Sequence, residues 1–148
     1  MSSAVAKQSV VVSTTPEKLY DFVSEAKRAT TFIPGLTKIE NVNPIGASVG
    51  QTWTYEFDWF GVVFKGNSKC SAAQRPSKYG FQTLTGNPSD WTYSFDPAGD
   101  GKTRLTLEVR YNVPESMIAK FASQSTLEKM NNDRAREIVN NVKTMIEG

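Results

Sequence analysis

The sequence predicts an α+β fold in which a long antiparallel sheet wraps around a C-terminal helix. Runs of alternating apolar and polar residues, typical of half-buried strands, fill the middle of the chain. Two short helical segments precede these runs, and one long amphipathic segment follows them. A sheet of this length must curl, and the apolar stripe of the long helix needs a surface to cover it. Wrapping the sheet around the helix satisfies both requirements.

Short elements open the chain. Residues 8–12 are rich in β-branched side chains and are predicted to form the first strand. Thr15 is a suitable N-cap for a helix that starts at Pro16, because proline fits the first helical position. A second short helical segment covers residues 25–32. It should end near Pro34 and Gly35, because the residue before a proline disfavours helix and glycine permits a turn.

Six further strands are predicted at residues 37–43, 50–60, 62–74, 79–85, 91–95 and 103–113. Turn-forming residues separate them, among them Gly61 between the second and third of these strands. The strand over 50–60 has the clearest pattern, because large aromatic side chains alternate there with polar ones. The register of 62–74 stays open, because both of its faces are mixed.

The C-terminal third of the chain is helical and begins at Pro114. Its early and late apolar positions fall on helix faces about 130° apart, which predicts a break over residues 122–126. A capping box that starts at Ser125 would restart the helix, giving a final helix of about 22 residues. The apolar stripe of this helix is predicted to include Leu127, Met130, Asn131, Arg134, Ile138, Val142 and Met145.

Five local motifs carry a family resemblance. They are STTPEKLYDFVSE after the first strand, FIPGLTKIENV, VGQTWTYEF, AAQRPSKYGFQTLTG, and GKTRLTLEVRYNVP before the last helix. Together with the order of elements, they resemble the START/Bet v 1-like (SRPBCC) superfamily and, within it, the bacterial polyketide cyclase/dehydrase-type proteins. The resemblance implies a helix-grip fold, with a curved seven-stranded antiparallel sheet around the last helix and two short helices after the first strand. It implies a single domain over residues 1–148.

The same resemblance implies a hydrophobic cavity between the sheet and the last helix. Members of the superfamily bind lipids, sterols, quinones, polyketides or plant hormones there, and a minority are enzymes. No residue motif of a characterised catalytic member is evident in this chain, so no catalytic residue is assigned.

The aromatic face of the 50–60 strand is the first candidate for a cavity wall, because aromatic surface with a few polar groups suits planar ligands. The alternative is that these rings fill the core outright. The residues expected to face a ligand are Trp53, Tyr55, Phe57 and Trp59 on this strand, Phe81, Trp91 and Tyr93 on later strands, and Met130, Asn131, Arg134 and Ile138 on the last helix.

Arg134 lies in the middle of an apolar stripe, where a charge costs stability unless it is paired or hydrated. Two interpretations stay open. Arg134 faces the cavity and binds an anionic or enolate group of the ligand. Otherwise its stem covers apolar surface while its head reaches solvent or a carboxylate such as Asp133 or Glu137.

Three other side chains have simpler expectations. Glu56 and Asp58 should point to solvent from the polar face of their strand, which argues against an acid/base pair. Cys70 should be a small buried residue.

The composition excludes several classes of function. The chain has 148 residues, no histidine and one cysteine, which excludes His-based triads, His-ligated zinc and an internal disulfide framework. The net charge is +2 without a block of Lys or Arg, so no nucleic-acid partner is expected. We expect no metal and no other cofactor. The absence of a signal peptide or membrane span predicts a cytoplasmic protein without stable membrane insertion, as a monomer or a homodimer.

Two functions stay open on these grounds. The first is binding or transport of a hydrophobic small molecule (a lipid, quinone, isoprenoid or aromatic polyketide) in the cavity. The alternative is a cyclase/dehydratase-type enzyme that acts on a polyketide-like or aromatic substrate in the same cavity.

Overall fold

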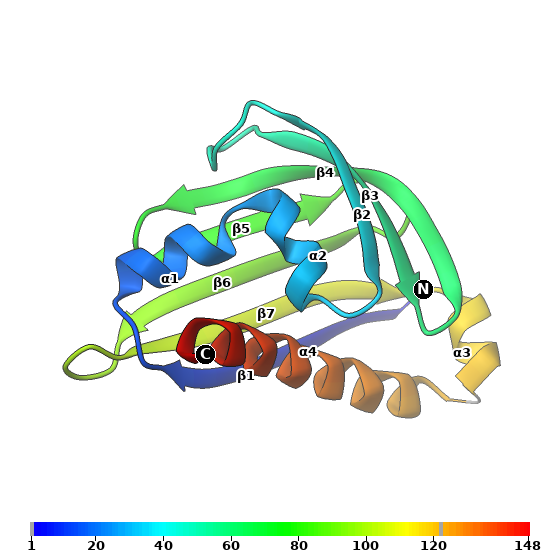
Figure 1. The fold of residues 1–148 in the computed structure, drawn as a ribbon. Helices are drawn as coiled ribbons and strands as arrows, with labels where there is room; N and C mark the ends of the chain where they lie inside the picture. The colour runs from blue at the N-terminus through cyan, green and yellow to red at the C-terminus, as the bar shows by residue number, and fades with distance from the viewer. Residues whose placement is uncertain (1, 122) are drawn as a thin grey trace.

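A curved seven-stranded antiparallel sheet wraps around one long helix in this computed structural model, which describes residues 2–121 and 123–148 (Figure 1). The strands are β1 (Ser2–Val12), β2 (Leu36–Asn43), β3 (Thr52–Trp59), β4 (Val62–Gln74), β5 (Lys78–Thr83), β6 (Ser89–Pro97) and β7 (Thr103–Val113). The helices are α1 (Pro16–Val23), the 3-10 turn η1 (Ala26–Arg28), α2 (Ala29–Phe32), α3 (Glu115–Phe121) and α4 (Gln124–Glu147). The predicted helix-grip fold is confirmed.

The strand order is β1-β7-β6-β5-β4-β3-β2, so only β1 lies away from its neighbour in sequence. It pairs with β7 over its whole length, from Ser2 opposite Val113 to Val12 opposite Thr103. The predicted first strand began at residue 8 and was therefore too short. Residues 2–7 have little strand propensity, but β7 offers them a paired partner. Ala4 and Ala6 are buried there, and their small side chains let α4 pack close to β1.

The short helices follow the predicted caps with small differences. Thr15 caps α1 by accepting a hydrogen bond from the backbone N–H of Lys18 (3.3 Å). The segment predicted at 25–32 is a 3-10 turn followed by the single turn of α2. In Figure 1, α1 and α2 lie together over the end of the sheet where α4 finishes. They close one end of the space between sheet and helix.

The start of α4 was predicted two residues too late. Its N-cap is Ser123, whose hydroxyl accepts a hydrogen bond from the backbone N–H of Thr126 (3.2 Å), so the capping box at Ser125 was wrong. Of the predicted break at 122–126, Ala122 lies outside the described residues. In the described part of the chain, no helix combines the length and the apolar character needed to cross a bilayer.

The structure settles the register of β4. Phe64 pairs with Phe57 and Cys70 pairs with Phe81, which places these side chains on the concave face of the sheet. Val63 lies on the other face and is 53% exposed. Cys70 is fully buried, as expected.

The buried stripe of α4 differs from the predicted one at its edges. Its buried residues are Leu127, Ala135, Ile138, Val139 and Val142. Met145 was placed on this stripe wrongly, because it is 43% exposed. It lies beside α2, where the Thr31 hydroxyl donates to its sulfur (3.8 Å).

Candidate ligand-binding cavity

A cavity lies between the concave face of the sheet and α4. Its volume is about 90 Å³. Aromatic side chains of β3, β5 and β6 form one wall, and residues of α4 form the wall opposite. Sites for drug-sized ligands are usually about 300–1,000 Å³. The cavity therefore has room for a small guest, and a larger one requires the walls to move.

Ten of the eleven residues predicted to face a ligand line this cavity. They are Trp53, Tyr55, Phe57, Trp59, Phe81, Trp91, Tyr93, Asn131, Arg134 and Ile138. Met130 does not line it, and that prediction was wrong. Asn131, Arg134, Ala135 and Ile138 share the helix face toward the cavity, while Met130 lies about 100° away from Asn131 around the helix. The rings therefore do not fill the core outright.

The aromatic wall is packed against itself. The rings of Phe81 and Trp91 stack at 5.4 Å and 15°, and Trp53 meets Phe81 edge-on at 5.5 Å. Tyr79 and Tyr93 stack at 6.3 Å. Because each ring holds its neighbour in place, this side of the cavity is preformed.

Polar side chains at the β5–β6 end of the cavity are hydrogen-bonded to other protein groups. The Tyr55 hydroxyl donates to the Thr85 carbonyl (2.6 Å) and accepts from the backbone N–H of Asn87 (3.3 Å). The indole N–H of Trp91 donates to the Ser89 hydroxyl (2.9 Å). These groups have their hydrogen bonds without any guest.

Three other polar atoms of the cavity wall have no hydrogen-bond partner among the described residues. They are the hydroxyls of Tyr93 and Tyr111 and the side-chain nitrogen Nδ2 of Asn131. Burial raises the pKa of both phenols, so both are neutral at ordinary pH. The nearby Asn131 amide opposes the rise in the Tyr111 pKa, although the two side chains do not form a hydrogen bond of normal geometry.

Tyr111 is a cavity residue that sequence reasoning missed. It lies on β7 among inward-facing aliphatic residues and is buried. The alternation of 105, 107, 109, 111 and 113 placed it on the inner face, and a single tyrosine among aliphatic residues was the available signal. Its proximity to Asn131 depends on how the sheet curves around α4.

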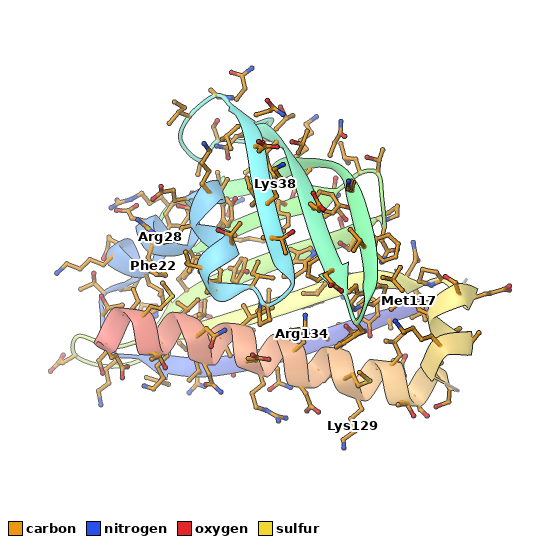
Figure 2. The ribbon with its side chains drawn as sticks, turned by 45° about the vertical axis from the view of Figure 1, so that its right-hand side comes forward. Phe22, Arg28, Lys38, Met117, Lys129 and Arg134 are labelled. Atoms are coloured by element: carbon orange, nitrogen blue, oxygen red, sulfur yellow. The ribbon has the colours of Figure 1, made fainter. Side chains whose placement is uncertain are left out.

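Arg134 closes the cavity near the loop before β2 (Figure 2). Its Nη1 donates to the Pro34 carbonyl (2.7 Å), and its guanidinium carbon lies 4.6 Å from the centre of the Phe60 ring. Desolvation lowers its pKa. Of the two interpretations left open, the structure combines parts of both. The side chain lines the cavity, and its head is held by a backbone carbonyl and a ring rather than by Asp133 or Glu137, neither of which forms an ion pair with it among the described residues.

The loop before β2 presses against β3 at Gly35. This residue has φ +88°, and a Cβ there would collide with the carbonyl of Asp58. The backbone N–H of Asp58 in turn donates to the Gly35 carbonyl (2.8 Å). Only glycine fits both constraints, so the loop that holds Pro34 beneath Arg134 is fixed by its neighbour in sequence.

Glu56 and Asp58 point away from the cavity, as expected. Neither lines it, and Asp58 is exposed. The Asp58 carboxylate accepts a hydrogen bond from the backbone N–H of Gly61 (2.7 Å). Its observed role is to support the β3–β4 turn.

The curved sheet, the gripped helix and the apolar cavity between them define a START/Bet v 1-like ligand-binding fold. The chain belongs to the family described as polyketide cyclase / dehydrase and lipid transport, which it matches over residues 3–147. No curated protein sequence matches the chain.

Solved structures share this fold at low sequence identity. The ZhuI aromatase/cyclase from a Streptomyces species is 12% identical, with a TM-score of 0.75 over 99% of this chain and 94% of that one. A START superfamily protein from Mycobacterium smegmatis is 13% identical, with a TM-score of 0.73 over 97% of both chains. TTHA0849 from Thermus thermophilus is 14% identical, with a TM-score of 0.71 over 96% of this chain and 99% of that one. At such identities the likeness extends to the fold alone.

Proposed function

We propose that this protein binds a small, largely apolar, aromatic molecule in the cavity between the sheet and α4. The observation that carries the proposal is the space left between the aromatic wall and the helix. Protein interiors are normally packed without such voids. A guest that fills this space gains dispersion contacts with walls that otherwise face no protein atoms there.

The chemistry of the walls supports an aromatic guest. Phe81, Trp91 and Trp53 offer ring faces and edges on one side, and Ile138 offers an aliphatic surface on the other. A planar guest placed between them gains stacking as well as burial of apolar area.

The second candidate is a cyclase or dehydratase that acts on a polyketide-like or aromatic substrate. One observation favours it: Nδ2 of Asn131 and the hydroxyl of Tyr111 are hydrogen-bond donors in the cavity wall that have no partner among the described residues. Two such donors stabilise an oxygen that gains negative charge, as an enolate does. No carboxylate lines the cavity in the described part of the chain, and the neutral phenols are poor bases. Such an enzyme would work mainly by folding its substrate into a reactive shape.

The test fills the cavity and follows a neutral fluorescent probe, N-phenyl-1-naphthylamine. Ala135→Leu adds a larger side chain to the α4 wall at a buried position. Asn140→Leu, on an exposed position of the same helix, is the matched control. We expect wild type and Asn140→Leu to enhance the probe's fluorescence equally, and Ala135→Leu to bind at least tenfold more weakly. Equal binding by all three, with folding verified by circular dichroism, would place the probe elsewhere and contradict the proposal.

Purification from the native host separates the two candidates. Solvent extracts of the protein are examined by mass spectrometry, and the enriched compound is incubated again with fresh protein. Recovery of the compound unchanged supports binding, whereas conversion to a product supports the enzyme.

A further inference from the structure

We infer that the guest carries a neutral carbonyl oxygen, and that Nδ2 of Asn131 and the hydroxyl of Tyr111 donate hydrogen bonds to it. This inference rests on the proposed function and deepens it by naming the group that the cavity recognises. The observation behind it is that two buried donors lie in one part of the cavity wall with no partner from the described residues.

Trp59 fixes which way the Asn131 amide points. Its indole N–H can only donate, and it donates to Oδ1 of Asn131 over 2.7 Å. The amide therefore cannot flip without losing this bond and setting two donors against each other. The buried Nδ2 points away from the Trp59 indole and has no hydrogen-bond partner in the part of the chain that the structure describes. Because this nitrogen has no lone pair to accept with, its missing partner must be an acceptor.

Tyr111 lies beside the same pair. Its ring meets that of Trp59 edge-on, with centroids 5.8 Å apart and an angle of 89° between the planes. The side chain is 6% exposed, and its hydroxyl has no partner among the described residues. A carbonyl oxygen has two lone pairs and can accept from both donors at once. A hydrocarbon guest would leave both donors unpaired, which is costly in a buried site.

Other polar groups of the cavity wall differ from the Asn131 and Tyr111 donors. The hydroxyl of Tyr55 and the indole N–H of Trp91 line the same cavity but bind protein groups. The hydroxyl of Tyr93 also has no hydrogen-bond partner among the residues that the structure describes. Tyr93 pairs with Leu107, four residues from Tyr111 along β7, which is about 13 Å at 3.3 Å per residue. Tyr93 therefore belongs to a different part of the wall, and the donor pair is local to Asn131 and Tyr111.

Among the described residues that line the cavity, the positive charge nearest Asn131 is held by other groups, and this favours a neutral carbonyl. Arg134 is one turn from Asn131, but its guanidinium lies against the Phe60 ring and its Nη1 donates to the Pro34 carbonyl. Asn131 and Tyr111 themselves carry no charge. A carboxylate guest would be buried among neutral donors, where the loss of its hydration is not offset.

The test uses three probes of nearly the same shape. Acetophenone and α-methylstyrene differ only in a carbonyl oxygen against a methylene group, and benzoate supplies a carboxylate. Their dissociation constants are measured by NMR titration for wild type, Tyr111→Phe, Asn131→Leu and Tyr55→Phe. Tyr111→Phe removes a hydroxyl that has no partner within residues 2–121 and 123–148, so we expect its fold to be preserved. Tyr55→Phe removes a hydroxyl of the same cavity that is already hydrogen-bonded, and it is the matched control.

We expect wild type to bind acetophenone more tightly than α-methylstyrene and benzoate. The preference for acetophenone over α-methylstyrene should fall about three- to tenfold in Tyr111→Phe and in Asn131→Leu, and stay within about twofold in Tyr55→Phe. An unchanged preference in Tyr111→Phe, with both probes still bound, would overturn the carbonyl site and leave the proposed function standing. Tighter binding of benzoate would overturn the neutral carbonyl. Failure of wild type to bind any of the three would overturn this inference together with the proposed function.

Discussion

The indole nitrogen of Trp59 donates a 2.7 Å hydrogen bond to Oδ1 of Asn131 and so joins β3 to α4. Both residues line the cavity. The bond ties the aromatic wall to the helix at one position beside the cavity. It also orients the Asn131 amide, so a structural contact determines which donor the cavity offers to a guest.

Removing the hydroxyl should change the free energy of unfolding in different directions at different tyrosines of the cavity. Tyr111→Phe and Tyr93→Phe remove buried hydroxyls for which the described residues offer no hydrogen-bond partner, so the free energy of unfolding should be unchanged or rise by up to about 1 kcal/mol. Tyr55→Phe removes hydrogen bonds to Thr85 and Asn87 and should cost about 1 kcal/mol. Urea unfolding of the three variants measures these differences. Equal losses in all three would mean that the hydroxyls of Tyr93 and Tyr111 are as well satisfied as that of Tyr55.

The loop before β2 should depend on Gly35 through two separable effects. Gly35 and Gly46 both have positive φ, +88° and +98°, so an alanine is strained at either position. Only at Gly35 would the added Cβ collide with backbone, at the Asp58 carbonyl, because nothing lies within 4 Å at Gly46. Gly46→Ala should cost about 1 kcal/mol in the free energy of unfolding, and Gly35→Ala at least about 1 kcal/mol more. Similar losses at both sites would contradict the close approach of the loop to β3.

Arg134 should hold this loop closed. Arg134→Met removes the hydrogen bond to Pro34 and the contact with Phe60, so the loop should open more often. Hydrogen exchange of the Asp58 amide, which donates to Gly35, should be about tenfold faster. Lys129→Met removes a positive charge from an exposed position on the same helix, where the side chain points away from the sheet (Figure 2), and should leave this exchange unchanged. Equal exchange in both variants would show that Arg134 does not restrain the loop.

Stability should change little between about pH 6 and 8 and should fall at high pH, where the Cys70 thiol and then the tyrosines of the unfolded chain ionise, because burial raises the pKa of these groups in the folded protein. The chain has no histidine, so no imidazole titrates between about pH 6 and 8. Burial raises the pKa of Tyr79 and Tyr93 above the ordinary value near 10, so above about pH 10 the unfolded chain releases phenol protons that the folded protein retains. This difference favours unfolding, and the free energy of unfolding should fall as pH rises further. Urea midpoints across the pH range measure this, and a steep loss between pH 6 and 8 would contradict it.

Periodic patterns predicted the parts of the fold that repeat. The alternation in β3 predicted that Trp53, Tyr55 and Trp59 share the buried face, and the structure has this arrangement. The ranges of β4 and β7 also agree with the prediction. In these strands the pattern of burial and the pattern of hydrogen bonding coincide, so one side-chain rule determines both.

Features that depend on a distant partner were missed. The early start of β1 depends on β7, which supplies the pairing that Ser and Ala do not favour by themselves. The partner of Arg134 is a backbone carbonyl, and a backbone acceptor leaves no trace in a pattern of side chains. Met130 was expected to line the cavity and does not, whereas Tyr111 lines it and was not predicted to. Both differences have a similar reason. Which residue reaches the cavity is set by the rotation of α4 within the curved sheet, which side-chain type does not reveal.

Intermolecular nuclear Overhauser effects between acetophenone and the protein test most directly whether a guest occupies the space between sheet and helix. We expect contacts from the phenyl protons to the methyl groups of Ile138 on the helix side of the cavity and to the rings of Phe81 and Trp91 on the sheet side. Contacts confined to exposed apolar side chains such as Ile45 and Leu84, or no contacts at all, would contradict it.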